Sequence, residues 1–209
     1  NAELSALKDA TWAIRRDRLR AAAEVESYFG PDPGEAALAV GFSLYQALSS
    51  LDRLEVRGRD SAGGELVVWN HGLDLEDPAL RHRLGERHDP LFTSRSVSVA
   101  GDALVFVYKA AAEIGELGDN TARLREQVRG DDLLRVALAA PTAEAVVLGH
   151  TRWASVGIIS ESNAHPQSSE ELGRPPAPGA THDHHRRQGH PGADGPPGAG
   201  GARQHRGVP

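Results

Sequence analysis

The fold of this chain is decided around residues 145–157, which read AVVLGHTRWASVG. The first four residues are apolar and partly β-branched, a pattern typical of a short β-strand, and Gly149 bounds that strand. A group of hydrogen-bond donors follows at the expected strand end. The guanidinium of Arg152 matches a carboxylate with two parallel hydrogen bonds. Trp153 offers a flat surface that can cover a ligand, and the Ser155 hydroxyl can donate or accept. This pattern predicts a site for a small polar ligand.

Each of these residues also has a plain structural explanation, because a tryptophan beside a strand is usually core and an arginine is usually a solvated charge. Two further segments favour the ligand site. Residues 51–63 read LDRLEVRGRDSAG, and residues 163–166 read NAHP. In this order, the three segments resemble those of the class II glutamine amidotransferases. The closest resemblance is to the glutaminase domain of the glucosamine-6-phosphate synthases, also called glutamine–fructose-6-phosphate aminotransferases.

The resemblance implies roles for individual residues. Arg152 would hold the α-carboxylate of glutamine, and Trp153 would lie over the pocket and gate the route of ammonia. Arg57 and Asp60 would order the site, although an ion pair between these two side chains is an equally open interpretation. The glutamine-binding residues that the resemblance implies are Arg152, Trp153, Ser155 and His165.

In the family, an N-terminal cysteine thiolate attacks the glutamine side-chain amide, and the released ammonia aminates fructose 6-phosphate in a sugar-isomerase-type domain. This sequence departs from that pattern because it contains no cysteine and begins with Asn1, which offers neither thiol nor hydroxyl. It also lacks the Asn-Gly pair expected for the oxyanion hole. Smaller departures are Ser155 in place of the usual threonine and Val156 in place of a common histidine.

We therefore expect a fragment of a glutamine-hydrolysing domain that is inactive as it stands. One alternative is a catalytically dead module that binds glutamine and regulates a partner. Another is a product that does not fold alone, because missing strands would leave sheet edges unpaired. The partners implied by the resemblance are glutamine and, through a further domain, a sugar phosphate. The intact protein is expected to be a homo-oligomer.

Composition narrows the class of protein. The 209 residues carry a formal charge of −6, with an isoelectric point near 5.9, which argues against a general nucleic-acid binder. No apolar run is long enough to span a bilayer, and no export leader is recognisable, so we expect a cytoplasmic protein without a membrane partner. No cofactor or metal is expected, because His71, His82 and His88 lack a ligand spacing.

Two long helices are predicted before the first strand. Residues 1–28 place Leu4, Leu7 and Ile14 in a seven-residue rhythm. Residues 35–54 carry an apolar stripe that predicts a core-facing helix. The stripe consists of Leu44, Ala47, Leu48, Leu51 and Leu54. Gly58 and Gly63 are expected to allow tight turns in the segment that follows this helix in the sequence.

Shorter elements follow. A strand is expected at residues 65–69, and a helix at residues 78–86 within a charged surface insertion. Residues 96–108 predict a hairpin around Gly101 and Asp102. Residues 114–129 predict a helix with Leu117, Leu124 and Val128 facing inward. Asp131 or Asp132 is expected to cap a further short helix through residue 139.

This order of elements predicts an α+β fold. The resemblance implies a partial four-layer α-β-β-α sandwich of the N-terminal-nucleophile type. We expect an N-terminal helix at residues 1–30, the partial amidotransferase domain at 35–170 and a disordered tail at 171–209. The tail is rich in Pro, Gly, His and Arg, which cannot bury enough apolar surface to fold. We hypothesise that it is translated out of frame, and we expect no specific metal role for its histidines 182, 184 and 185.

Overall fold

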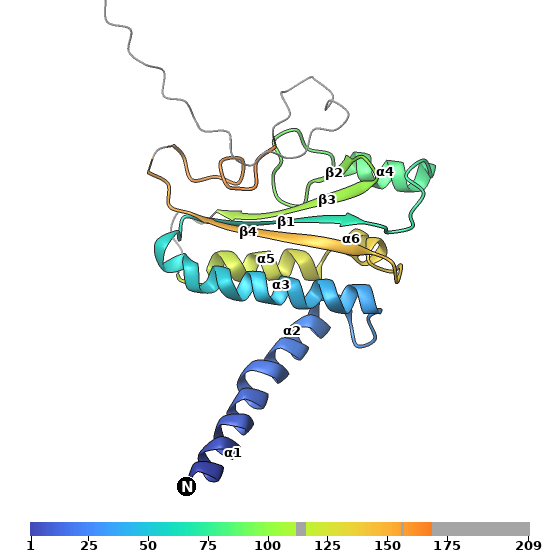
Figure 1. The fold of residues 1–209 in the computed structure, drawn as a ribbon. Helices are drawn as coiled ribbons and strands as arrows, with labels where there is room; N and C mark the ends of the chain where they lie inside the picture. The colour runs from blue at the N-terminus through green and yellow to red at the C-terminus, as the bar shows by residue number, and fades with distance from the viewer. Residues whose placement is uncertain (112–115, 156, 169–209) are drawn as a thin grey trace, which may run out of the picture.

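The computed structural model describes residues 1–111, 116–155 and 157–168. It has an α+β fold in which helices pack on a four-stranded antiparallel sheet (Figure 1). The elements are α1 (Ala2–Ala13), the π-helical turn η1 (Ile14–Arg18), α2 (Leu19–Phe29), α3 (Glu35–Leu54), the 3-10 turn η2 (Glu55–Arg57), β1 (Ser61–Trp69), α4 (Pro78–Glu86), β2 (Val97–Ala100), β3 (Ala103–Ala111), α5 (Asp119–Arg129), α6 (Asp132–Ala137) and β4 (Glu144–Arg152).

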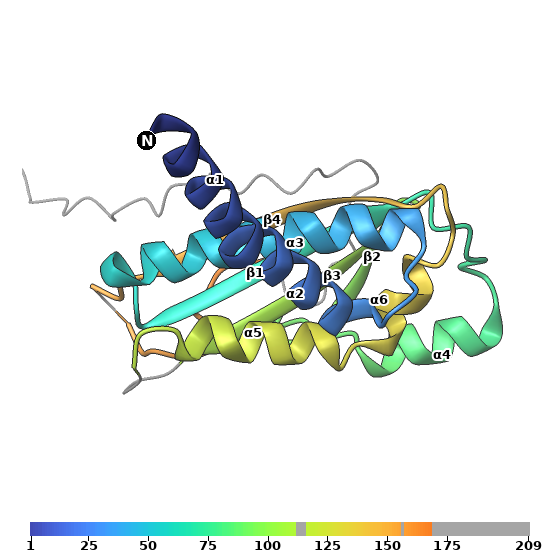
Figure 2. The same cartoon turned by 90° about the horizontal axis from the view of Figure 1, so that it is seen from below.

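The strands lie in the order β2-β3-β1-β4. Gly63 of β1 pairs with Lys109 on one side and with His150 on the other. Helices α3 and α5 lie side by side against one face of this sheet, as Figure 2 shows. Between them and the sheet is the main core, in which Leu66 and Phe106 are fully buried. The described strands form a single sheet, so the second sheet of a four-layer sandwich remains a prediction.

Helix α3 begins and ends where the sequence predicts. Leu44, Leu48 and Leu51 are buried as expected, and Ala47 is half-buried. Leu54 was expected in the same stripe, but it is 51% exposed. It is the last residue of the helix, where the chain turns into η2, and Glu55 is buried in its place.

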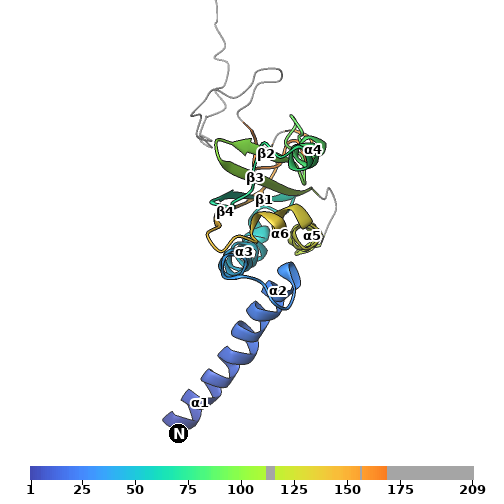
Figure 3. The same ribbon diagram turned by 90° about the vertical axis from the view of Figure 1, so that its right-hand side faces the viewer.

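The predicted N-terminal helix is present, since helical residues run from Ala2 to Phe29. Leu4, Leu7 and Ile14 are exposed, because α1 projects away from the sheet and its helices (Figure 3). The wide turn η1 separates α1 from α2. Helix α2 packs on α3 and α5, and it does so through side chains other than Leu4, Leu7 and Ile14. The buried residues of α2 are Ala21, Val25 and Tyr28.

Other elements match or correct the expectations. The hairpin, α4 and the Asp131 cap of α6 are confirmed. Strand β1 starts at Ser61, so Gly63 lies inside a strand rather than in a turn. Leu117 is exposed because α5 begins only at Asp119. Residues 112–115 and the tail at 171–209, with its histidines 182, 184 and 185, lie outside the described residues.

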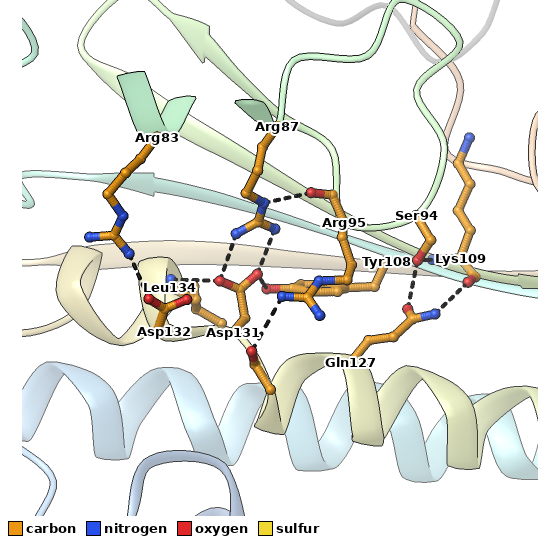
Figure 4. A network of polar contacts seen from close by, with 11 residues as sticks. Arg83, Arg87, Ser94, Arg95, Tyr108, Lys109, Gln127, Asp131, Asp132 and Leu134 are labelled. Atoms are coloured by element: carbon orange, nitrogen blue, oxygen red, sulfur yellow. Dashed lines mark hydrogen bonds and ion pairs between the residues drawn. The ribbon is translucent and has the colours of Figure 1, made fainter. Parts of the chain in front are cut away.

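A buried ion pair joins the loop after α4 to the start of α6. Both terminal guanidinium nitrogens of Arg87 donate to Asp131 at 2.7 Å, and the Tyr108 hydroxyl donates to the same carboxylate at 2.8 Å (Figure 4). Burial raises the pKa of the Asp131 carboxyl group, but the hydrogen bonds and positive charge of Arg87, together with the bonds from Leu134 and Tyr108, outweigh burial and lower this pKa. The network therefore links the end of α4 and the start of α6 to strand β3.

A second ionic network ties the helices together. Arg125 of α5 donates to Glu24 of α2 at 2.8 Å and to Asp52 of α3 at 2.7 Å. The Tyr28 hydroxyl donates to the same Glu24 carboxylate. Helices from three parts of the sequence are therefore held in one arrangement beneath the sheet. Among the described residues, no helix has the length and apolar character needed to cross a membrane.

Candidate functional site

Two segments that are far apart in sequence meet at the end of the sheet. We call residues 55–60 the support segment and residues 152–155 the binding turn. Strand β4 extends to Arg152 and pairs with the start of β1, so Arg152 lies opposite Ser61. His150 and Thr151 are therefore strand residues rather than loop residues, and the chain leaves the sheet at Trp153.

The support segment contacts the binding turn directly. The Asp60 N–H donates to the carbonyl oxygen of Arg152 at 3.2 Å, and the Asp60 carboxylate accepts from the Ala154 N–H at 2.6 Å. A further bridge pairs Arg59 with Arg152. At Gly58 a side chain would press on the Thr151 hydroxyl and the Arg152 backbone nitrogen, at 2.9 and 3.1 Å from a Cβ atom. The glycine therefore allows the two backbones to approach.

The predicted ordering residues take different places. Asp60 holds the binding turn through backbone groups, as described above. Arg57 is exposed at the end of η2, and no ion pair links it to Asp60 in the described part of the chain. The structure thus gives Asp60 a definite local role and leaves Arg57 at the surface.

The binding turn is open to solvent. Trp153 is 70% exposed and Ser155 is exposed, whereas Arg152 is half-buried. A Cβ atom on Gly157 would lie 3.7 Å from a terminal nitrogen of Arg152, so the chain curls back beside the guanidinium. The Arg152 side chain is thus partly shielded beside Gly157, whereas the Trp153 ring is open to solvent.

His165 lies over the face of the sheet opposite α3 and α5. A Cβ atom on Gly63 would overlap the carbonyl oxygen of His165, so only glycine permits this approach. The rings of His165 and His150 are 4.4 Å apart. Burial lowers the pKa of His150, and the nearby His165 and Arg152 lower it further. The structure thus brings His150, Arg152 and His165 together at one end of the sheet.

Sequence reasoning missed a buried lysine on this same face. Lys109 is fully buried, and its Nζ lies 5.4 Å from the centre of the Phe92 ring. Burial lowers its pKa to about 8, while Glu161, Asp89 and Glu65 favour its charged form. Figure 4 shows the side chain extending away from Gln127. The signal was a single charge inside the apolar strand ALVFVYKAA.

The arrangement offers no thiol nucleophile, since the 209 residues contain no cysteine. Within the described ranges, no three His, Asp or Glu side chains gather closely enough to hold a metal ion. His71 instead contacts the Asp102 carbonyl oxygen and the Leu73 N–H through its two ring nitrogens.

Searches of family models, curated protein sequences and solved structures find no match to this chain. The resemblance to class II glutamine amidotransferases therefore rests on the residues of the chain itself.

Proposed function

We propose that this chain carries the carboxylate-binding part of a glutamine site of the class II amidotransferase type. In this proposal Arg152 binds the α-carboxylate of glutamine, and Trp153 and Ser155 line the same ligand. His165 borders the site from the neighbouring segment. In the family, the ammonia released from glutamine aminates fructose 6-phosphate to glucosamine 6-phosphate, and we propose that this chain derives from such an enzyme.

The observation that carries the proposal is the contact between the two motifs. The resemblance rests on the support segment and the binding turn, which lie about 90 residues apart in sequence, and Asp60 joins them through Ala154 at 2.6 Å. A chance match of two short motifs gives no reason for such a contact. A carboxylate on the support segment that fixes the backbone beside Arg152 is what a preorganised binding residue requires.

Hydrolysis of glutamine needs a nucleophile at the amide carbon and donors for the resulting oxyanion. The chain has no cysteine thiol. The hydroxyl group of Ser155 lies in an exposed turn, with no base bonded to it among the described residues. We therefore expect binding without ammonia release from this chain.

A second candidate function is a non-catalytic module that binds glutamine and regulates a partner. Two observations together favour it: the binding turn is held by Asp60, and the sequence has no cysteine. The two candidates differ in expected affinity. A dedicated sensor needs a closed site, whereas an open turn with Trp153 at 70% exposure fits a weak partial site.

Calorimetric titration with L-glutamine, together with an ammonia assay, tests the proposal. We expect a dissociation constant on the order of 1 mM, equivalent to about −4 kcal/mol, and no ammonia above the buffer rate. Micromolar binding without ammonia would favour the regulatory module. Ammonia release, or a complete lack of binding, would contradict the proposed function.

A further inference from the structure

We infer that Asn120, at the start of α5, is a positioning residue for the binding turn. It acts through the support segment, because its side-chain hydrogen bond within the described structure goes to Arg59 and not to Arg152. This inference deepens the proposed function, because it names what holds the carboxylate-binding arginine in place. It rests on contacts between α5 and the support segment that none of the sequence motifs indicated.

The first step is the attachment of the support segment to α5. Glu55 is only 1% exposed, and its carboxylate accepts hydrogen bonds from the N–H groups of Gly118 and Thr121. These N–H groups belong to the first turn of the helix, where they have no partner within the helix. Glu55 therefore caps α5 from a distant part of the sequence and fixes one end of the support segment.

The second step is the Asn120 side chain. It is 3% exposed, and its amide nitrogen donates to the Arg59 carbonyl oxygen at 2.8 Å. Its Oδ1 atom has no hydrogen-bond partner among the described residues. The bond to Arg59 is thus the polar link that the structure gives this side chain, and it fixes the other end of the support segment.

The third step leads from the support segment to the site. Arg59 pairs with Arg152, and the next residue, Asp60, bonds both Arg152 and Ala154. A shift of the Arg59 backbone would therefore move both groups that hold the binding turn. Loss of one supporting contact of this kind loosens a site without unfolding the scaffold.

The variant Asn120→Asp tests this inference. It preserves size, and a negative charge in the first turn of α5 is favourable to the helix. The new carboxylate faces the Arg59 carbonyl oxygen and cannot donate to it. Arg123→Gln is the matched control, because Arg123 is exposed on the same helix and the substitution changes the net charge by the same amount.

The first readout is amide hydrogen exchange of Ala154, which does not depend on any ligand. We expect Asn120→Asp to speed this exchange about tenfold, with the β1 core amides unchanged, because the Asp60 bond opens more often. We expect the glutamine dissociation constant to rise about threefold to tenfold in the same variant. The control should change neither quantity.

Unchanged Ala154 exchange in Asn120→Asp would overturn the inference. If Asn120→Asp fails to fold, Asn120→Ser serves instead, since serine suits a helix start but is too short to reach Arg59. Faster Ala154 exchange in a chain that does not bind glutamine would uphold the positioning role and remove the proposed function. The two claims can therefore fail separately.

Discussion

The carboxylate of Asp60 accepts a hydrogen bond from the backbone N–H of Ala154, 94 residues further along the chain, at 2.6 Å. This bond fixes the path of the chain directly after Arg152. We expect Asp60→Ala to lower the free energy of unfolding by about 1.5–3 kcal/mol, because a hydrogen bond to a charged acceptor is lost. Urea unfolding measures this change. Asp32→Ala, in the exposed loop before α3, is the control. Equal stability of the two variants would contradict the role given to Asp60.

Gly63 and Gly64 are neighbours in β1, and substitution by alanine should have opposite effects on stability at the two positions. A Cβ atom on Gly63 would overlap the His165 carbonyl oxygen, whereas one on Gly64 would lie 3.6 Å from the Leu148 carbonyl oxygen. We expect Gly63→Ala to lower the free energy of unfolding by about 1–3 kcal/mol, as overpacking does. Gly64→Ala should be neutral or stabilising by about 0.5–1 kcal/mol. Thermal melts of both variants test the pair, and the opposite ranking would show that residue 165 does not rest on β1.

The Arg87–Asp131 pair should dominate the acid sensitivity of the fold. Asp131→Ala leaves Arg87 and the Tyr108 hydroxyl without this acceptor, so we expect a loss of about 3–5 kcal/mol in unfolding free energy. Asp132→Ala removes an exposed pair with Arg83 and should cost at most about 1 kcal/mol. Similar losses in the two variants would contradict this account.

The same pair gives a pH dependence with a definite sign. The folded pKa of Asp131 is lower than its ordinary value of 3.8. Its contribution is therefore fully present well above pH 3.8 and is lost as the pH falls through the lower folded value. Urea unfolding between pH 2 and 6 should show this loss in the parent but not in Asp131→Ala.

Lys109 predicts a change on the alkaline side. Its folded pKa is about 8, and its ordinary value is 10.5, so the unfolded chain binds more protons between these values. The free energy of unfolding should therefore rise with pH from 8 to 10.5 through this residue, and Lys109→Met should remove that rise. The chain has two lysines, Lys8 and Lys109, so carbon-13 spectra of labelled lysine resolve the titration. A Lys109 midpoint near 10.5 would refute the prediction.

Local patterns in the sequence predicted most of the elements. The bounds of α3 follow from its apolar stripe, which is a local signal, and α4 likewise lies where a helix was expected, at residues 78–86. The exposure of Leu4 and Leu7 could not be predicted, because periodicity does not say whether a partner surface exists. Gly63 was misassigned to a turn because the approach of His165 is a tertiary contact.

The candidate site was predictable in part. The pairing of the Asp60 and Arg152 regions was expected from their resemblance to one family. The hydrogen bonds that Glu55 and Asn120 make with backbone groups of distant segments could not be predicted. A polar side chain that is buried looks the same in the sequence as one at the surface. The single charge in the strand ALVFVYKAA marks Lys109 as unusual, but its burial depends on the loop around Phe92, which is a tertiary contact.

The central claim is that Arg152 binds the α-carboxylate of glutamine. The most direct test follows the Ala154 amide and the Trp153 indole by NMR during titration with L-glutamine. A parallel titration uses 4-aminobutanamide, which lacks the carboxylate. We predict saturable shifts with glutamine. The dissociation constant should rise about tenfold, equivalent to about 1.4 kcal/mol, for the analogue and for glutamine with Arg152→Gln. The control Arg53→Gln, at an exposed residue of α3, should match the parent. Equal dissociation constants for the two ligands, or an unchanged dissociation constant for glutamine in Arg152→Gln, would contradict the claim.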